Sequence, residues 1–82
     1  MSRVLYTTQG VCSKFIEVET DTDGRISYCH FHGGCSGNTQ GVARLVLGKT
    51  PSEVIHLLDG VRCGNKSTSC PDQLCRALER LQ

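Results

Sequence analysis

Six cysteines in a chain of only 82 residues are the feature that most restricts how this sequence can fold. A chain of this length forms one small domain and buries only about 60% of its unfolded surface, so a metal, disulfides or a partner chain often adds stability. The N-terminal residues lack the apolar run of a signal peptide, and no hydrophobic stretch is long enough to span a bilayer. We therefore expect a cytoplasmic protein without membrane contact, whose cysteines bind metal or act as reactive thiols.

The charge balance restricts the class of partner. Nine basic and eight acidic residues leave a formal net charge of +1, and no basic stripe stands out along the chain. Phosphate contacts need clustered lysine and arginine side chains. We therefore expect no nucleic-acid partner.

The first part of the chain has the residue pattern of a β-hairpin. Residues 6–20 are rich in β-branched and aromatic side chains that alternate with polar ones, which predicts a strand with one buried face. Residues 21–24 end in glycine, as a hairpin turn does, and residues 25–32 predict the returning strand. Each face of the returning strand carries both apolar and polar groups, so the alternation leaves its buried face open.

Three helices are predicted after the hairpin. The first covers residues 39–47 and the last covers residues 71–81. Between them, Thr50, Pro51 and Glu53 fit a capping box that begins the second helix, and Gly60 marks its end. The apolar positions that recur at helical spacing are Val42, Leu45 and Val46, then Val54, Leu57 and Leu58, then Leu74, Ala77, Leu78 and Leu81.

These elements predict an α+β fold over residues 1–82: an N-terminal antiparallel β-hairpin followed by three short helices packed on it, as a single small domain. A two-stranded hairpin is marginally stable alone and has two open edges. We therefore expect a homodimer.

The positions of the cysteines divide them into two groups. Cys29 lies mid-strand and Cys75 lies at the edge of an apolar helical stripe, where a thiol packs as a small hydrophobe. The other four are near turns and element ends: Cys12, Cys35, Cys63 and Cys70. Four thiolates satisfy tetrahedral zinc and would tie the hairpin to two helix starts. Because no pair has C-x2-C spacing, buried structural thiols remain the alternative to a metal.

Cys70 stands directly before Pro71, which suits the first position of a helix, so we expect Cys70 at the N-cap. The positive end of the helix dipole favours a thiolate there, and Cys35 is placed similarly. Thiol redox work by Cys35 and Cys70 is therefore the rival hypothesis, although a C-x-x-C motif is absent. We assign no catalytic residue.

Two weaker candidates surround Cys35. His32 lies three residues before it, and the intervening glycines could let both side chains share a metal, so His32 is a reserve ligand. A glycine-rich loop at a helix start can also bind an anion or a nucleotide phosphate through backbone N–H groups. The residues of that candidate loop are Gly34, Ser36, Gly37 and Asn38.

Several separated motifs occur in the order typical of one family. They are residues 33–38 (GGCSGN), residues 44–46 (RLV), Cys63-Gly64, and residues 68–74 (TSCPDQL). With these pieces the chain resembles the TSCPD-domain family, in particular its small stand-alone bacterial members. The family motifs match at Cys35, Cys63 and Cys70, and Cys12 matches the stand-alone type.

The resemblance implies an association with deoxyribonucleotide synthesis. A similar domain forms a C-terminal appendage of adenosylcobalamin-dependent ribonucleotide reductases, and stand-alone members are often labelled ribonucleoside-diphosphate reductase. Reductase catalysis needs a radical-generating cofactor and a large barrel, which 82 residues cannot house. The resemblance thus implies an accessory or binding module with a ribonucleotide reductase as partner, not an enzyme acting alone.

Overall fold

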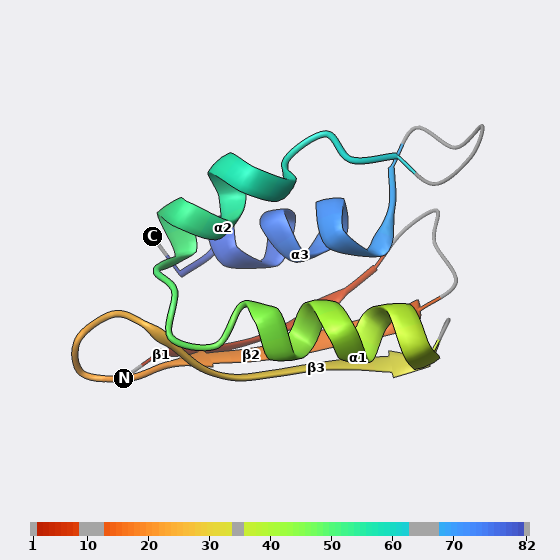
Figure 1. Cartoon of the computed structure of the whole chain (residues 1–82). Coiled ribbons are helices and arrows are strands. Elements are labelled where there is room, and N and C mark those ends of the chain that lie inside the picture. The colour runs from red at the N-terminus through yellow and green to blue at the C-terminus, as the bar shows by residue number, and fades with distance from the viewer. Residues whose placement is uncertain (1, 9–12, 34–35, 63–67, 82) are drawn as a thin grey trace.

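A computed structural model describes residues 2–8, 13–33, 36–62 and 68–81 of the chain. Three strands, β1 (Ser2–Thr7), β2 (Ser13–Thr20) and β3 (Ile26–Gly33), are followed by three helices, α1 (Ser36–Leu45), α2 (Pro51–Leu58) and α3 (Cys70–Glu79). Figure 1 shows all three helices on one face of the sheet, so the other face, called the uncovered face below, carries no described helix. The α+β prediction is confirmed.

The sheet has one strand more than the predicted hairpin. Its order is β1-β2-β3, with both pairs antiparallel. The prediction of a single strand over residues 6–20 was wrong, because the chain reverses within this segment and Tyr6 pairs with Ile16. Both strands are rich in β-branched and aromatic residues, so composition did not separate them. One open edge of the predicted hairpin is therefore covered by β1.

A β-bulge decides which side chains of β3 are buried. Thr20 pairs with Ile26 and Glu19 pairs with Tyr28, so Ser27 is an extra residue without an opposite partner. The bulge turns Ile26 to the same face as Phe31, and both are buried against the helices. Strict alternation had placed them on opposite faces, which is why the sequence pattern left the buried face open.

The hairpin turn between β2 and β3 forms as predicted. The Asp21 carboxylate accepts hydrogen bonds from the backbone N–H groups of Asp23 and Arg25, at 2.9 and 3.0 Å. Gly24 has φ +78°, in the left-handed region that glycine adopts without steric cost.

The core lies between the sheet and α3. α1 packs against β3, α3 packs across β1 and β2, and α2 packs on α3 (Figure 1). The apolar stripe of α3 is confirmed, since Leu74, Ala77 and Leu78 are fully buried. Fully or nearly fully buried residues from the other elements complete the core: Ile16, Val18, Ile26, Phe31, Val46 and Val54.

Two leucines of the predicted stripes are exposed. Leu45 is 74% exposed and Leu57 is 61% exposed. α1 packs through Val42 and Ala43 instead, Val46 directly after the helix is buried, and α2 turns Val54 inward. Helical spacing gives the relative position of apolar residues but not which part of a wide apolar arc meets the sheet. α1 also starts at Ser36, three residues before the predicted helix.

Candidate functional site

One end of the molecule gathers the element ends that flank the predicted cysteine site. Thr7 pairs with Phe15, and Ser13 pairs with Gly33, so the end of β1, the start of β2 and the end of β3 are neighbours. Figure 1 shows the starts of α1 and α3 at this same end of the sheet. Cys12, Cys35 and Cys63 lie outside the described residues, but their sequence neighbours Ser13, Ser36 and Arg62 are described.

Cys70 is the first residue of α3, not its N-cap as predicted. The N-cap is Ser69, whose side-chain oxygen accepts a hydrogen bond from the backbone N–H of Asp72 at 3.2 Å. A serine hydroxyl is a much better acceptor for an N–H group than a thiol, so the cap moves one residue back. Cys70 is 7% exposed and belongs to the core cluster. It is a nearly buried thiol at a helix start.

A hydrogen-bond network around Asp72 connects the start of α3 to the end of α2. The Asp72 carboxylate accepts from the Thr68 hydroxyl at 2.5 Å and from the backbone N–H of Gly60 at 2.7 Å. Ser69 donates its hydroxyl to the Val61 carbonyl at 2.6 Å, and the Gln73 amide donates to Thr68 at 3.0 Å. The network thus fixes the described residues on both sides of the segment that contains Cys63.

The sequence interpretation missed this network, although its pattern was visible. Serine followed three residues later by an acid, as in Ser69 and Asp72, is typical of a helix N-terminus. Burial alone would raise the pKa of Asp72. The hydrogen bonds from Thr68 and Gly60 and the nearby Arg76 guanidinium nevertheless hold that pKa below its usual value. Asp72 is therefore an ionised, buried carboxylate that holds Thr68 and Gly60 together.

The two cysteines predicted to pack as small hydrophobes do so. Cys75 is fully buried, with its sulfur 3.9 Å from the Val54 carbonyl oxygen, and Cys29 is half-buried against the core. Burial raises the pKa of Cys29 to about 12 and that of Cys75 to about 11. Both are protonated thiols at neutral pH, and a protonated thiol is neither a nucleophile nor a metal ligand.

His32 lies on the uncovered face of the sheet. Its ring stacks on Phe15 with centroids 4.1 Å apart, and its Nε2 is 3.3 Å from Oε1 of Glu17. Cys70 lies on the opposite, helix-covered side. The structure therefore does not bring the reserve ligand His32 beside Cys70.

Within the described part of the chain, no three His, Cys, Asp or Glu side chains are grouped so that they could hold a metal ion. Three of the four predicted cysteine ligands lie outside this part. Of the predicted anion loop, Ser36, Gly37 and Asn38 form the first turn of α1, and Gly34 lies outside the described residues.

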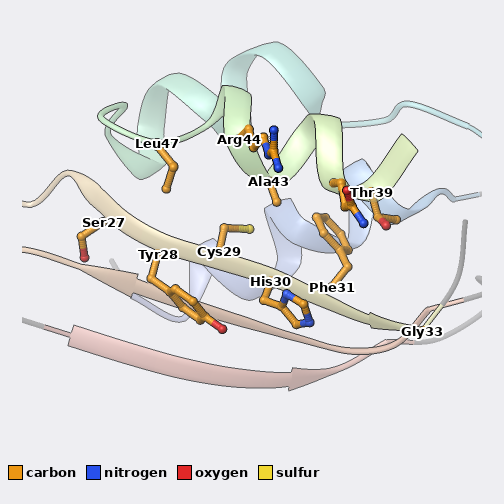
Figure 2. A pocket seen from close by; sticks show the side chains of 11 residues that line it. Ser27, Tyr28, Cys29, His30, Phe31, Gly33, Thr39, Ala43, Arg44 and Leu47 are labelled. Atoms are coloured by element: carbon orange, nitrogen blue, oxygen red, sulfur yellow. The ribbon is translucent and has the colours of Figure 1, made fainter. Parts of the chain in front are cut away.

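A groove of about 570 Å³ runs between β3 and α1. Figure 2 shows Cys29 and Phe31 on the α1 side of β3, whereas Tyr28 and His30 point to the uncovered side. Among the described residues that line the groove, Arg44 is the only Arg, Lys, Asp or Glu. The sequence interpretation did not identify this groove, because it depends on which helix lies along the strand.

No helix in the described ranges combines the length and apolar character needed to cross a membrane.

A family model described as the TSCPD domain matches residues 2–82. No match was found among curated proteins or among solved structures.

Proposed function

The chain belongs to the TSCPD domain family, and on that premise we propose that it is a zinc-binding accessory module whose ligands are Cys12, Cys35, Cys63 and Cys70. The observation that carries the proposal is the gathering, at one end of the sheet, of the described residues that flank these cysteines. Consecutive Cα atoms are about 3.8 Å apart, so each cysteine is tied to its described neighbour. Four thiolates at about 2.3 Å from one ion suit zinc.

The burial of Cys70 favours ligation over thiol redox work. Thiol–disulfide exchange needs access of a second thiol to the attacking sulfur. Cys70 is only 7% exposed, and a structural zinc site, whose four ligands all come from the protein, needs no opening for a second reactant. A zinc site would also supply stability that a small core lacks.

The zinc proposal is tested by metal analysis of protein purified without chelators. We expect one zinc per chain in the wild type and loss of zinc in each serine variant of the four proposed ligands. Cys29→Ser is the matched control, since Cys29 is a protonated thiol in the middle of β3, and this variant should keep its zinc. Wild-type protein that is folded by circular dichroism but contains no metal would refute the proposal.

We further propose that the module acts in the cytoplasm as an accessory to a ribonucleotide reductase. Family membership supports this association. Affinity purification from the source cell should recover a ribonucleotide reductase with the wild type. Recovery of the tagged protein without any reductase, under conditions that preserve its fold and metal, would contradict this part of the proposal.

A further inference from the structure

β3 is an edge strand without the usual protection against pairing. Residues 26–33 contain no Lys, Arg, Asp, Glu or Pro, the residues that commonly block edge-to-edge association. The opposite edge strand, β1, carries Arg3, which is ion-paired with Glu17. The β3 edge is therefore the more available of the two for another strand.

Part of the β3 edge is already occupied. The backbone N–H of Ile26 donates to the Lys49 carbonyl, and the Gly48 N–H donates to the Ile26 carbonyl, both at 2.8 Å. Outside the β2–β3 ladder, no backbone hydrogen bond joins residues 28–32 to another described residue. These five residues form an open edge about 17 Å long.

Apolar side chains lie on both sides of this open edge. Leu47, in the turn after α1, is 47% exposed on the helix side, and Tyr28 is 41% exposed on the uncovered side. Leu47 and Ala43 line the groove on the α1 side of β3, and Figure 2 shows Tyr28 on the other side of the strand. An added strand would bury these groups, and the small side chain of Ala43 permits close approach at α1.

We propose that a second copy of this chain pairs antiparallel with β3, which joins two sheets into one six-stranded sheet with the two α1 helices above the seam. A two-fold axis at His30, the centre of the open edge, would place Tyr28 opposite the partner's His32 and Cys29 opposite the partner's Phe31. Every symmetric antiparallel register matches residues of the same face, so helix-covered side chains meet helix-covered ones.

The charge pattern favours a second copy over a charged partner. The edge strand has no Asp, Glu, Lys or Arg, and interface cores are depleted of charge. Two copies therefore meet along β3 without like-charge repulsion. Arg44 is exposed, and its long side chain can direct the guanidinium to solvent.

The size of the open edge predicts a reversible, concentration-dependent dimer. A stable interface buries about 800 Å² from each partner, about a sixth of the 4893 Å² accessible surface of this chain. A five-residue strand edge with one flanking helix is smaller than that. This inference is independent of zinc, so a metal-free chain would not contradict it.

The test compares two double-lysine variants, one with the substitutions on the β3 edge and one with them on the β1 edge. Analytical ultracentrifugation from micromolar to about 1 mM chain should show the wild type passing from one to two chains per particle. Tyr28→Lys with His30→Lys places like charges across the seam and should keep the particle at one chain. The matched control, Leu5→Lys with Thr7→Lys on β1, should dimerise like the wild type.

Two other results for the oligomeric state overturn the proposal. If the wild type stays monomeric over this concentration range, a second copy does not pair with β3. The groove would then bind a different partner. A dimer that survives the β3 lysines, or that is lost with the β1 lysines instead, uses another surface. If the β3 variant does not fold, amide hydrogen exchange of the wild type decides. Exchange at residues 28–32 must slow with concentration while β1 does not change.

Discussion

Asp72 shows how single residues of the TSCPD motif, Thr68 to Asp72, act in this fold. Thr68, Ser69 and Asp72 form hydrogen bonds that connect α3 to the end of α2, and Cys70 packs into the core. Pro71 lies in the first turn of α3, where its missing N–H costs no hydrogen bond. In the described residues, therefore, the motif first of all ties the start of α3 to Gly60 and Val61, which follow α2.

We predict that Asp72→Asn lowers the free energy of unfolding by about 1–3 kcal/mol at pH 7, because a buried charge-assisted hydrogen-bond acceptor is lost. The folded pKa of Asp72 is lowered, so its stabilising effect is complete above the unfolded pKa of about 3.9 and is lost as the pH falls through the folded pKa. Urea unfolding at several pH values measures both effects.

The control for this prediction is Asp23→Asn, which removes the same charge from an exposed turn. It should change the free energy of unfolding by less than about 0.5 kcal/mol. If the Asp72 variant shows the same loss of stability at low pH as the wild type, another carboxylate is responsible for the acid sensitivity.

At the scale of the elements, the two later helices begin with different caps. In α2, Thr50 and Glu53 form the predicted capping box, with the Glu53 N–H donating to the Thr50 hydroxyl at 3.2 Å. In α3, Ser69 accepts from the Asp72 N–H and also donates to the Val61 carbonyl. The second cap therefore also connects the start of α3 to Val61, just beyond the end of α2.

We predict that Thr50→Ala costs about 1 kcal/mol of unfolding free energy, the usual cost of a lost cap. Ser69→Ala should cost about 2 kcal/mol, since it also leaves the Val61 carbonyl without its hydroxyl donor. Thermal unfolding by circular dichroism compares both with Thr22→Ala in the exposed turn. Equal costs for the two cap variants would show that the Val61 bond adds nothing.

At the scale of the whole molecule, α3 holds the fold together. It contacts both other helices and two strands, and its inner face is fully buried. We predict that Leu78→Ala costs about 2–5 kcal/mol, because the cavity lies where sheet and helices meet. The same substitution at the exposed Leu45 should cost less than about 0.5 kcal/mol.

Chemical denaturation of the two leucine variants measures this contrast. A cost at Leu45 comparable to that at Leu78 would mean that the α1 surface is covered by another molecule in solution. That result would place a second interface on the helices, away from the β3 edge.

The sequence by itself determined the α+β class, the β2–β3 hairpin, the α2 capping box, the inner face of α3 and the packing role of Cys29 and Cys75. These features depend on local hydrogen bonds and on side-chain periodicity within one element. The motif pieces also predicted the family, which the match over residues 2–82 confirms.

Only the tertiary structure decided the third strand, the burial of Ile26 through the bulge at Ser27, and the exposure of Leu45 and Leu57. Each of these depends on which segments meet in space, and a periodic pattern in one segment does not specify that. The Asp72 network and the open β3 edge arise in the same way. The network joins residues from different elements. The open edge depends on which described segments lie beside β3.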